Sequence, residues 1–125
     1  MEKEFVTYEI ALKLKELSFD EVCLAVYFNN KFQLVKGFNI NNVDLHVANE
    51  IDAVLAPLWQ QAIDWLREKY NIHISLGYSV HHKLYNYRID SSVIMMKRII
   101  YWDSNYEKLR EQAILKALEL INKTI

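Results

Sequence analysis

The residues of this sequence that are best suited to chemistry are four histidines and one cysteine. Two of the histidines, His81 and His82, are adjacent in a short polar stretch that is typical of a turn. Neighbouring side chains in a tight turn usually diverge, and no nearby Cys, Asp or Glu has the spacing of a metal site. We therefore favour a surface turn over a metal site, and we expect neither a metal ion nor a cofactor.

A third histidine, His73, lies on the polar side of an alternating segment, residues 72–80. Its neighbours on that face are two serines of the same segment and, if the next segment pairs in the matching register, two polar residues across from it: Ser75, Ser79, Asn86 and Arg88. Such a face can carry catalysis, but antiparallel sheets commonly have one solvated face. The solvated face is the favoured interpretation, and a small enzyme that uses His73 is the third functional hypothesis.

Other candidates for chemistry have simpler interpretations. Cys23 lies in an apolar run, where cysteine is more often a small hydrophobic residue than a nucleophile. Asp64 and Glu68 lie one turn apart on the solvated face of a predicted helix, whereas acid–base catalysis by paired carboxylates needs a pocket. The sequence contains no glycine-rich phosphate loop and no CxxC, HExxH or GxSxG motif. We therefore expect no enzymatic activity.

One cluster combines aromatic and basic side chains in a way that suits nucleic acid: Lys83, Tyr85, Tyr87, Arg88, Lys97, Arg98 and Tyr101. Aromatic rings on a sheet can stack on bases while Lys and Arg contact phosphates. The closing helix and the order of the strands also resemble a double-stranded RNA-binding domain, although the start of that helix, NYEKLREQ, is not rich in lysine. Because the formal charge is −1, nucleic-acid binding is the alternative and not the leading hypothesis.

Length and composition set the broad class of the protein. The chain has 125 residues, which suits a single domain over residues 1–125 with its own core. A single cysteine excludes an intramolecular disulfide and fits a reducing compartment. The charged start MEKEF is unlike a signal peptide, and no apolar run approaches the ~20 residues of a membrane-spanning helix. We expect a cytoplasmic protein that does not enter a membrane.

The longest patterned stretch runs from Ala56 to Val80 and joins a helix directly to a strand. Apolar residues recur at helical spacing in its first part, which predicts a buried stripe: Leu58, Trp59, Ala62, Ile63, Trp65, Leu66 and Tyr70. Pro57 suits the first position of this helix. The strict alternation that follows predicts a strand whose apolar side faces the core: Ile72, Ile74, Leu76, Tyr78 and Val80.

Local signals also define the elements before this stretch. Thr7 is suited to cap a helix from about Tyr8 to Leu17. The pair Asn29-Asn30 separates two β-prone segments, and asparagine tolerates positive φ, so we predict a hairpin. Residues 43–48 form either a short edge strand or a loop, and residues 49–55 lead into the central helix.

After the central stretch we predict strands over Leu84–Asp90 and Val93–Trp102, the second without a defined register. A capping box, Ser104 to Glu107, precedes a last helix from about residue 105 to residue 122. Leu115 falls outside the buried stripe of that helix and is either a single exposed leucine or a partner contact. The order α-β-β-(β)-α-β-β-β-α predicts an α+β fold, in which a mainly antiparallel sheet of about 4–6 strands has three helices packed on one face.

Three segments in order resemble a family of small uncharacterised proteins of Bacteroidetes and their bacteriophages, crAss-like phages included: EFVTYEIALKLKELSFDEVCLAVY, APLWQQAIDWLREKYNIHI and YEKLREQAILKALELI. The resemblance covers roughly half of the chain and is most specific in APLWQQAIDWLREKY. It implies the cytoplasm of a bacterium or of an infected host cell, and it implies no reaction. The chain departs from the family in HHKLYNYRIDSSVIMMKRIIYWDS, where members that bind different partners are expected to differ.

The leading hypothesis is a small non-enzymatic binding or regulatory module of phage or mobile-element origin, which acts through protein–protein contacts. The chain has more apolar and aromatic side chains than one small core needs, and aromatic residues and Met are enriched at interfaces. The candidate interaction surface consists of Tyr85, Tyr87, Arg88, Met95, Met96, Lys97, Arg98, Trp102 and Leu115. The expected partner is a host or phage protein, and a homodimer through the sheet edge near Val93–Tyr101 is one form of this hypothesis.

Overall fold

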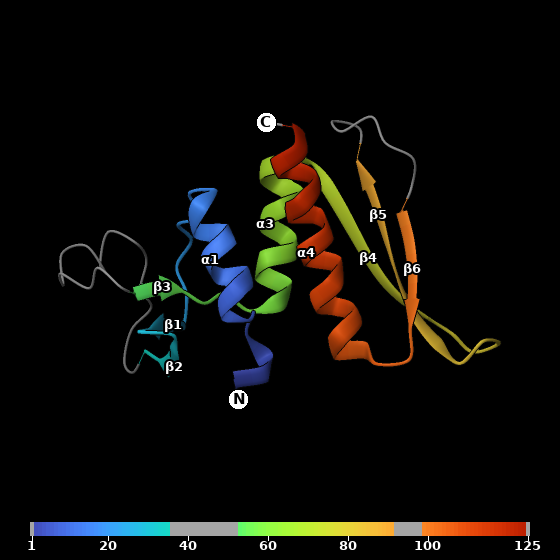
Figure 1. Ribbon diagram of the computed structural model, residues 1–125, viewed down its shortest axis with the longest axis horizontal. Helices are drawn as coiled ribbons and strands as arrows, with labels where there is room; N and C mark the ends of the chain where they lie inside the picture. Colours follow the sequence, from blue (N-terminus) through green and yellow to red (C-terminus); the bar gives the residue numbers. More distant parts are fainter. Residues whose placement is uncertain (1, 36–52, 92–98, 125) are drawn as a thin grey trace. The chain divides into compact units, whose positions relative to one another are not determined.

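The computed structural model describes residues 2–35, 53–91 and 99–124 (Figure 1). The chain divides into two compact units, residues 1–62 and 63–125, and each unit is described by itself. The expectation of a single domain over the whole chain stays a prediction. The α+β class, the antiparallel pairing and the order of the elements are confirmed. The described strands form two sheets of three strands, however, and not one larger sheet.

The first unit combines a helix with a small antiparallel sheet. Its elements are η1 (Glu2–Glu4), α1 (Tyr8–Glu16), β1 (Ala25–Phe28), β2 (Lys31–Leu34) and β3 (Ala53–Leu55), followed by the start of α3 (Trp59–Tyr70). The strand order is β2-β1-β3. The Thr7 hydroxyl accepts a hydrogen bond from the Ile10 N–H at 3.4 Å, which confirms the predicted cap. Asn29 and Asn30 have φ of 52° and 64° and connect β1 to β2, which confirms the predicted hairpin.

Strand β3 was not predicted, because residues 49–55 were expected only to lead into the central helix. It pairs antiparallel with β1, and all three of its residues are buried. A strand of three apolar residues is too short to show a period of two, so tertiary pairing decides its structure. The open choice between strand and loop for residues 43–48 lies outside the described residues.

Helix α3 begins two residues later than Pro57, so the prediction for its first turn was wrong. Pro57 accepts a hydrogen bond from the Val6 N–H, and Leu58 forms an isolated bridge with Phe5. This pairing holds the chain extended up to Leu58, which is 37% exposed and does not join the buried stripe. Leu58 occupies the cap position instead, and its N–H donates to Gln61 Oε1 at 3.3 Å.

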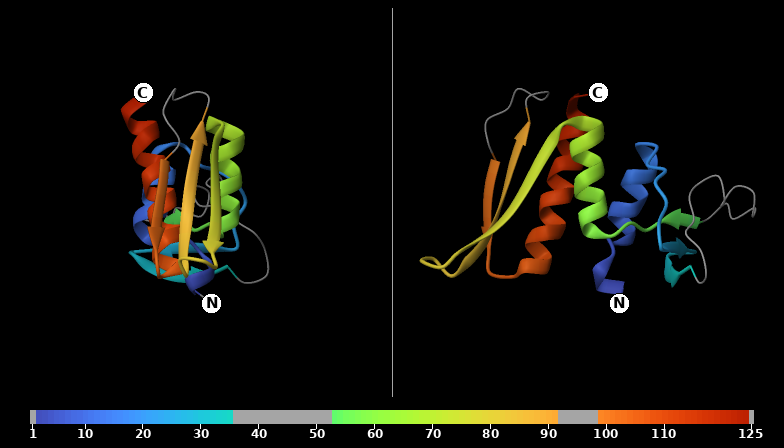
Figure 2. Two further views of the ribbon diagram at one scale, coloured as in Figure 1. Left: turned by 90° about the vertical axis from the view of Figure 1, so that its right-hand side faces the viewer. Right: turned by 180° about the vertical axis from the view of Figure 1, so that it is seen from behind.

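The second unit contains the end of α3, the strands β4 (Ile72–Ser79), β5 (Leu84–Ser91) and β6 (Ile99–Asp103), and helix α4 (Tyr106–Thr124). The sheet order is β4-β5-β6, and every pairing is antiparallel. Figure 2 shows α3 and α4 on the same side of this sheet. The apolar stripe of α4 packs there against buried residues of the strands, among them Ile72, Tyr87 and Ile89.

The cap of α4 lies one residue beyond the predicted Ser104. Asn105 Oδ1 accepts the Lys108 N–H at 2.9 Å, and the Asn105 carbonyl accepts the Leu109 N–H. Asparagine is as good a cap as serine, so the local sequence allows either start. Among the helices of the described residues, none combines the length and the apolar character required to cross a bilayer.

Candidate interaction surface

The β4–β5–β6 sheet has two chemically different faces. Directly opposite residues of an antiparallel pair share a face, so Tyr85, whose ring lies 5.2 Å from that of Tyr106 on α4, marks the helix-facing side. The opposite side, here called the open face, carries His73, Ser75, Gly77, Asn86, Arg88, Asp90, Ile100 and Trp102. No described element of the second unit lies over the open face (Figure 2).

Strand β4 is buried at its start and exposed at its end. Ile72 is buried and Leu76 is half-buried, but Tyr78 is 50% and Val80 is 80% exposed. The prediction that Tyr78 and Val80 face the core was therefore wrong. The reason is that the hairpin bends away from the helices of its unit towards its tip (Figures 1 and 2). Alternation in the sequence predicts which side chains share a face but not how far the covering helices reach.

Tyrosines gather on the helix-facing side towards the hairpin tip. The rings of Tyr78 and Tyr85 have centroids 4.8 Å apart, and Tyr87 stacks on Tyr101 at 5.7 Å. Tyr87 is 5% exposed, and burial, followed by the charges of Tyr101 and Glu119, raises the pKa of its hydroxyl. Tyr87 and the half-buried Tyr85 therefore contribute mainly to packing within the unit, and Tyr78 and Tyr101 are the most exposed of the four rings.

Strand β6 is an edge strand with exposed apolar residues on both faces. It pairs with β5 on one side, and no described strand pairs with its other side. Ile100, Tyr101 and Trp102 follow one another along it and are 51%, 46% and 42% exposed. The Trp102 ring also meets the His82 ring edge to face, with centroids 5.7 Å apart. This combination leaves backbone hydrogen-bonding groups and large side chains available at one edge.

The polar part of the open face agrees with the register that was expected for it. Ser75 lies opposite Arg88, and His73 lies opposite Asp90. Arg88 Nε is 3.1 Å from Asp90 Oδ2, and His73 Nε2 shares a hydrogen bond of 2.8 Å with Asn71 Oδ1. His73 and the Arg88–Asp90 ion pair are both exposed to solvent. Their interactions are therefore weak, because water competes for the same groups.

The structure distributes the predicted interaction residues over different surfaces. Tyr85 and Tyr87 lie on the helix-facing side, whereas Arg88 and Trp102 lie on the open face. Leu115 is half-buried on α4. The other four predicted residues, Met95, Met96, Lys97 and Arg98, lie outside the described residues.

Sequence reasoning missed the exposure of Ile100. The segment that contains β6 is apolar almost throughout, so its pattern does not show which side chains face away from the helices. The pairing of Ile100 with Arg88 places it on the open face. The exposure of Ile100 next to that of Tyr101 becomes visible only once the register is known.

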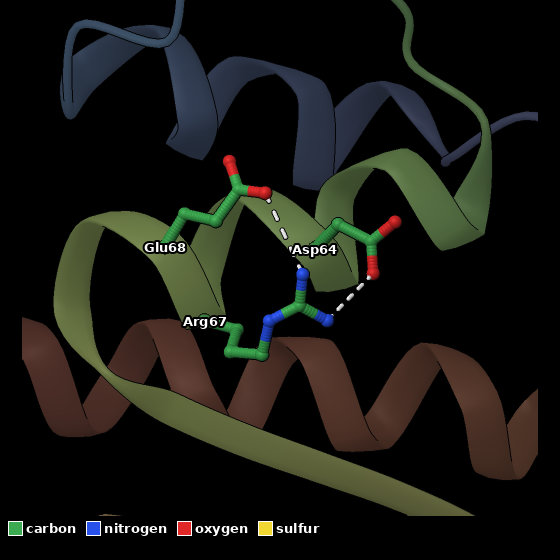
Figure 3. Close-up of polar contacts among 3 residues, drawn as sticks. All are labelled: Asp64, Arg67 and Glu68. Carbon is green, nitrogen blue, oxygen red and sulfur yellow. Dashed lines mark hydrogen bonds and ion pairs between the residues drawn. The ribbon is translucent and has the colours of Figure 1, made fainter.

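Cys23 and the carboxylates Asp64 and Glu68 are the remaining candidates for chemistry, and the structure places them in a buried site and on an exposed helix face respectively. Cys23 is buried, its thiol donates to the Glu21 carbonyl at 3.3 Å, and burial together with the charge of Glu21 raises its pKa to about 12. Asp64 and Glu68 form exposed ion pairs with Arg67 at 3.1 and 3.5 Å (Figure 3). Within the described ranges, no group of three His, Cys, Asp or Glu residues is placed to hold a metal ion.

Comparison with known proteins finds no relative of the chain. No protein-family model, no curated protein and no solved structure matches the chain. The resemblance to small Bacteroidetes and phage proteins therefore stays a prediction, and the functional argument depends on the described surfaces alone.

Proposed function

We propose that the chain is a small non-enzymatic binding module that acts through protein–protein contacts made by β6 and the adjoining open face. The observation that carries this proposal is the run Ile100, Tyr101 and Trp102, three large apolar side chains exposed in succession on an edge strand. The setting that we propose is the cytoplasm of a bacterium or of its phage-infected cell, on the resemblance of the sequence.

Edge strands are normally protected against pairing, and the described residues of β6 include neither of the residue types that usually protect an edge, lysine and proline. Lysine, proline, a bulge or a covering element blunts the edges of natural sheets. The five residues of β6 include no lysine and no proline, and Asp103 at its end is the one charged residue. Exposed backbone groups bordered by aromatic and aliphatic side chains are the features that strand-addition interfaces use.

The aromatic side chains support a protein partner in particular. Tyrosine and tryptophan are enriched at the centres of protein interfaces, because they bury a large area with few rotatable bonds. A nucleic-acid partner would need rings and positive charges on one surface. Here Tyr85 and Tyr87 lie on one side of the sheet and Arg88 on the other, so Arg88 does not share a surface with these tyrosines. Arg88 does share the open face with Trp102, but its guanidinium forms an ion pair with Asp90 there.

A comparison of matched variants tests this proposal. The chain would be tagged and expressed in a Bacteroidetes host, with and without phage, as wild type, as Ile100→Ser/Trp102→Ser, and as the control Tyr78→Ser/Val80→Ser. Both double variants remove exposed apolar side chains, but only the first alters β6. After chemical crosslinking, mass spectrometry would quantify every protein joined to the chain, including a second copy of it.

The proposal predicts at least one crosslinked protein whose yield falls about tenfold in the β6 variant and not in the control. Equal yields from all three proteins would contradict it, as would loss in the control alone. Circular dichroism of each purified protein would show whether the variants keep their secondary structure.

A further inference from the structure

We infer that the partner of β6 is the β6 strand of a second copy of this chain, paired antiparallel about a two-fold axis at Tyr101. This inference rests on the proposed function, because it names what occupies the same edge. The two copies would then share one continuous antiparallel sheet of their β4, β5 and β6 strands.

The register follows from the symmetry and from the length of the strand. A two-fold axis perpendicular to an antiparallel sheet places residues with a constant sum of positions opposite each other and keeps matching faces together. Only an axis at Tyr101 uses all five residues of β6, from Ile99 to Asp103. Tyr101 then faces Tyr101 of the second copy, Ile100 faces its Trp102, and Ile99 faces its Asp103.

This register joins the exposed apolar residues of the strand to one another. Ile100 and Trp102 of both copies would form a cluster of four side chains on the open face, where each is now about half exposed. Pairs of an aromatic with an aliphatic residue are among the stabilising cross-strand pairs. Tyr101 and its copy would meet on the opposite face, so exposed side chains on both faces of β6 would become more buried.

The charges of β6 do not oppose the pairing. Asp103 is the charged residue of the strand, and it falls opposite Ile99 rather than opposite its own copy. Its carboxylate is also occupied within its own chain, since Oδ1 accepts the Asn105 N–H at 2.8 Å and Oδ2 lies 3.9 Å from Lys108 Nζ. No like charges therefore stand directly across the two-fold axis.

The other edge of the same sheet is less suited to this role. On its open face β4 presents His73, Ser75 and Gly77, which would gain little from burial. Its apolar residues Ile72, Ile74 and Leu76 are already buried or half-buried on the helix-facing side. Pairing through β4 would therefore cover polar surface on the open face and one exposed tyrosine, Tyr78, on the other. Pairing through β6 covers the same number of tyrosines and, in addition, two apolar residues on the open face.

The size of the contact sets the expected affinity. A contact between two five-residue strands is small beside standard protein–protein interfaces, which bury roughly 1,200–2,000 Å² in total. A contact of this size fits a dimer that forms at micromolar concentration and dissociates on dilution. The inference therefore predicts a concentration-dependent dimer.

Cysteine crosslinking tests the position of the axis. A residue on the two-fold axis has its own copy directly opposite, with Cα atoms about 4.5–5.5 Å apart, which is within the range of a disulfide. Tyr101→Cys should therefore form a covalent dimer under mild oxidation. Val80→Cys, at an exposed position on the hairpin tip, is the control for random collision, and wild type with its buried Cys23 is the control for background.

Sedimentation velocity with two lysine variants tests the choice of edge. Ile100→Lys and Ser75→Lys each place a lysine on the open face of an edge strand, on β6 and on β4 respectively. Lysine at an edge opposes strand pairing. The expected result is a dimer Kd at least tenfold weaker for Ile100→Lys and unchanged for Ser75→Lys.

A monomeric wild type at all accessible concentrations would overturn the inference, as would a disulfide yield for Tyr101→Cys no higher than for Val80→Cys. Dissociation by Ser75→Lys but not by Ile100→Lys would overturn it in favour of the β4 edge. These failures differ from a failure of the proposed function. If the chain is a monomer that still crosslinks to another protein through β6, the proposed function stands, but the partner is that other protein and not a second copy. If Ile100→Lys does not fold, the crosslinking of Tyr101→Cys decides alone.

Discussion

Arg88 on β5 lies directly opposite Ile100 on β6, on the open face of the sheet. The guanidinium of Arg88 turns to Asp90 of its own strand, to which it forms an ion pair at 3.1 Å. Tyr87, the residue before Arg88, points to the other side and stacks on Tyr101. One strand therefore separates a charged side chain from the tyrosine rings that the sequence pattern grouped with it.

We predict that the chain does not bind single-stranded RNA or DNA through this sheet. Fluorescence anisotropy of labelled oligonucleotides at low salt is expected to show no saturable binding, because Arg88 does not share a surface with the tyrosines. On the face that Arg88 shares with Trp102, its charge is paired with that of Asp90. Binding that falls steeply with salt and weakens in Arg88→Gln would contradict this prediction and restore the nucleic-acid hypothesis.

A buried hydrogen bond in the first unit gives a prediction about stability. The Tyr27 hydroxyl donates to the Val6 carbonyl at 2.7 Å, and both residues are buried. Tyr27→Phe leaves that carbonyl without this donor and should lower the free energy of unfolding by about 1–2 kcal/mol in urea titrations. The control is Tyr8→Phe, because the Tyr8 ring packs on Tyr27 while its hydroxyl has no hydrogen-bond partner among the described residues. If both substitutions change the free energy of unfolding equally, the hydrogen bond between Tyr27 and Val6 does not stabilise the fold.

The hairpin turn between β1 and β2 gives a second prediction about stability. Asn30 has φ of 64°, a conformation that asparagine and glycine adopt more easily than branched residues. Asn30→Val should lower the free energy of unfolding by about 1–2 kcal/mol, while Asn30→Gly should leave it unchanged or raise it slightly. Thermal or urea unfolding measures both, and a tolerated valine would show that the turn has another shape.

The buried thiol gives a prediction about pH. The pKa of Cys23 is raised from 9.0 to about 12, so the thiol stays neutral in the folded protein at pH 8. A thiol reagent should label it slowly in buffer and completely in urea. The neutral thiol contributes its full stability below pH 9, and this contribution is lost as pH rises towards 12, because the unfolded thiol ionises first.

The difference in free energy of unfolding between wild type and Cys23→Ala measures this pH dependence. Between pH 9 and 12 the free energy of unfolding of wild type should therefore fall relative to that of Cys23→Ala. Rapid labelling at pH 8 in the absence of urea would contradict both the burial and the raised pKa.

Local signals in the sequence predicted the elements whose structure is decided locally. Thr7 caps α1, and Asn29 and Asn30 form the hairpin turn, because a side-chain hydrogen bond and a preferred φ act within a few residues. The alternation from Ile72 also identified which residues of β4 share a face.

Features that depend on distant pairing were not predictable in the same way. Strand β3 exists because it pairs with β1, and α3 starts late because Leu58 and Pro57 pair with the N-terminal segment. The exposure of Val80 depends on how far the helices cover the sheet, and no local pattern encodes that distance. For the candidate site, Trp102 was identified from its residue type, whereas Ile100 needed the register of β6 against β5.

Amide hydrogen exchange of β6 tests most directly whether this edge is the contact surface. Mass spectrometry would follow the peptide that contains residues 99–103 at low and at high protein concentration, in wild type and in Ile100→Lys. We predict that protection of this peptide rises with concentration in wild type and stays constant in the variant, while the β4 peptide exchanges equally throughout. Unchanged exchange of β6 at every concentration, or protection that appears on β4 instead, would contradict the assignment of β6 as the pairing edge of a second copy.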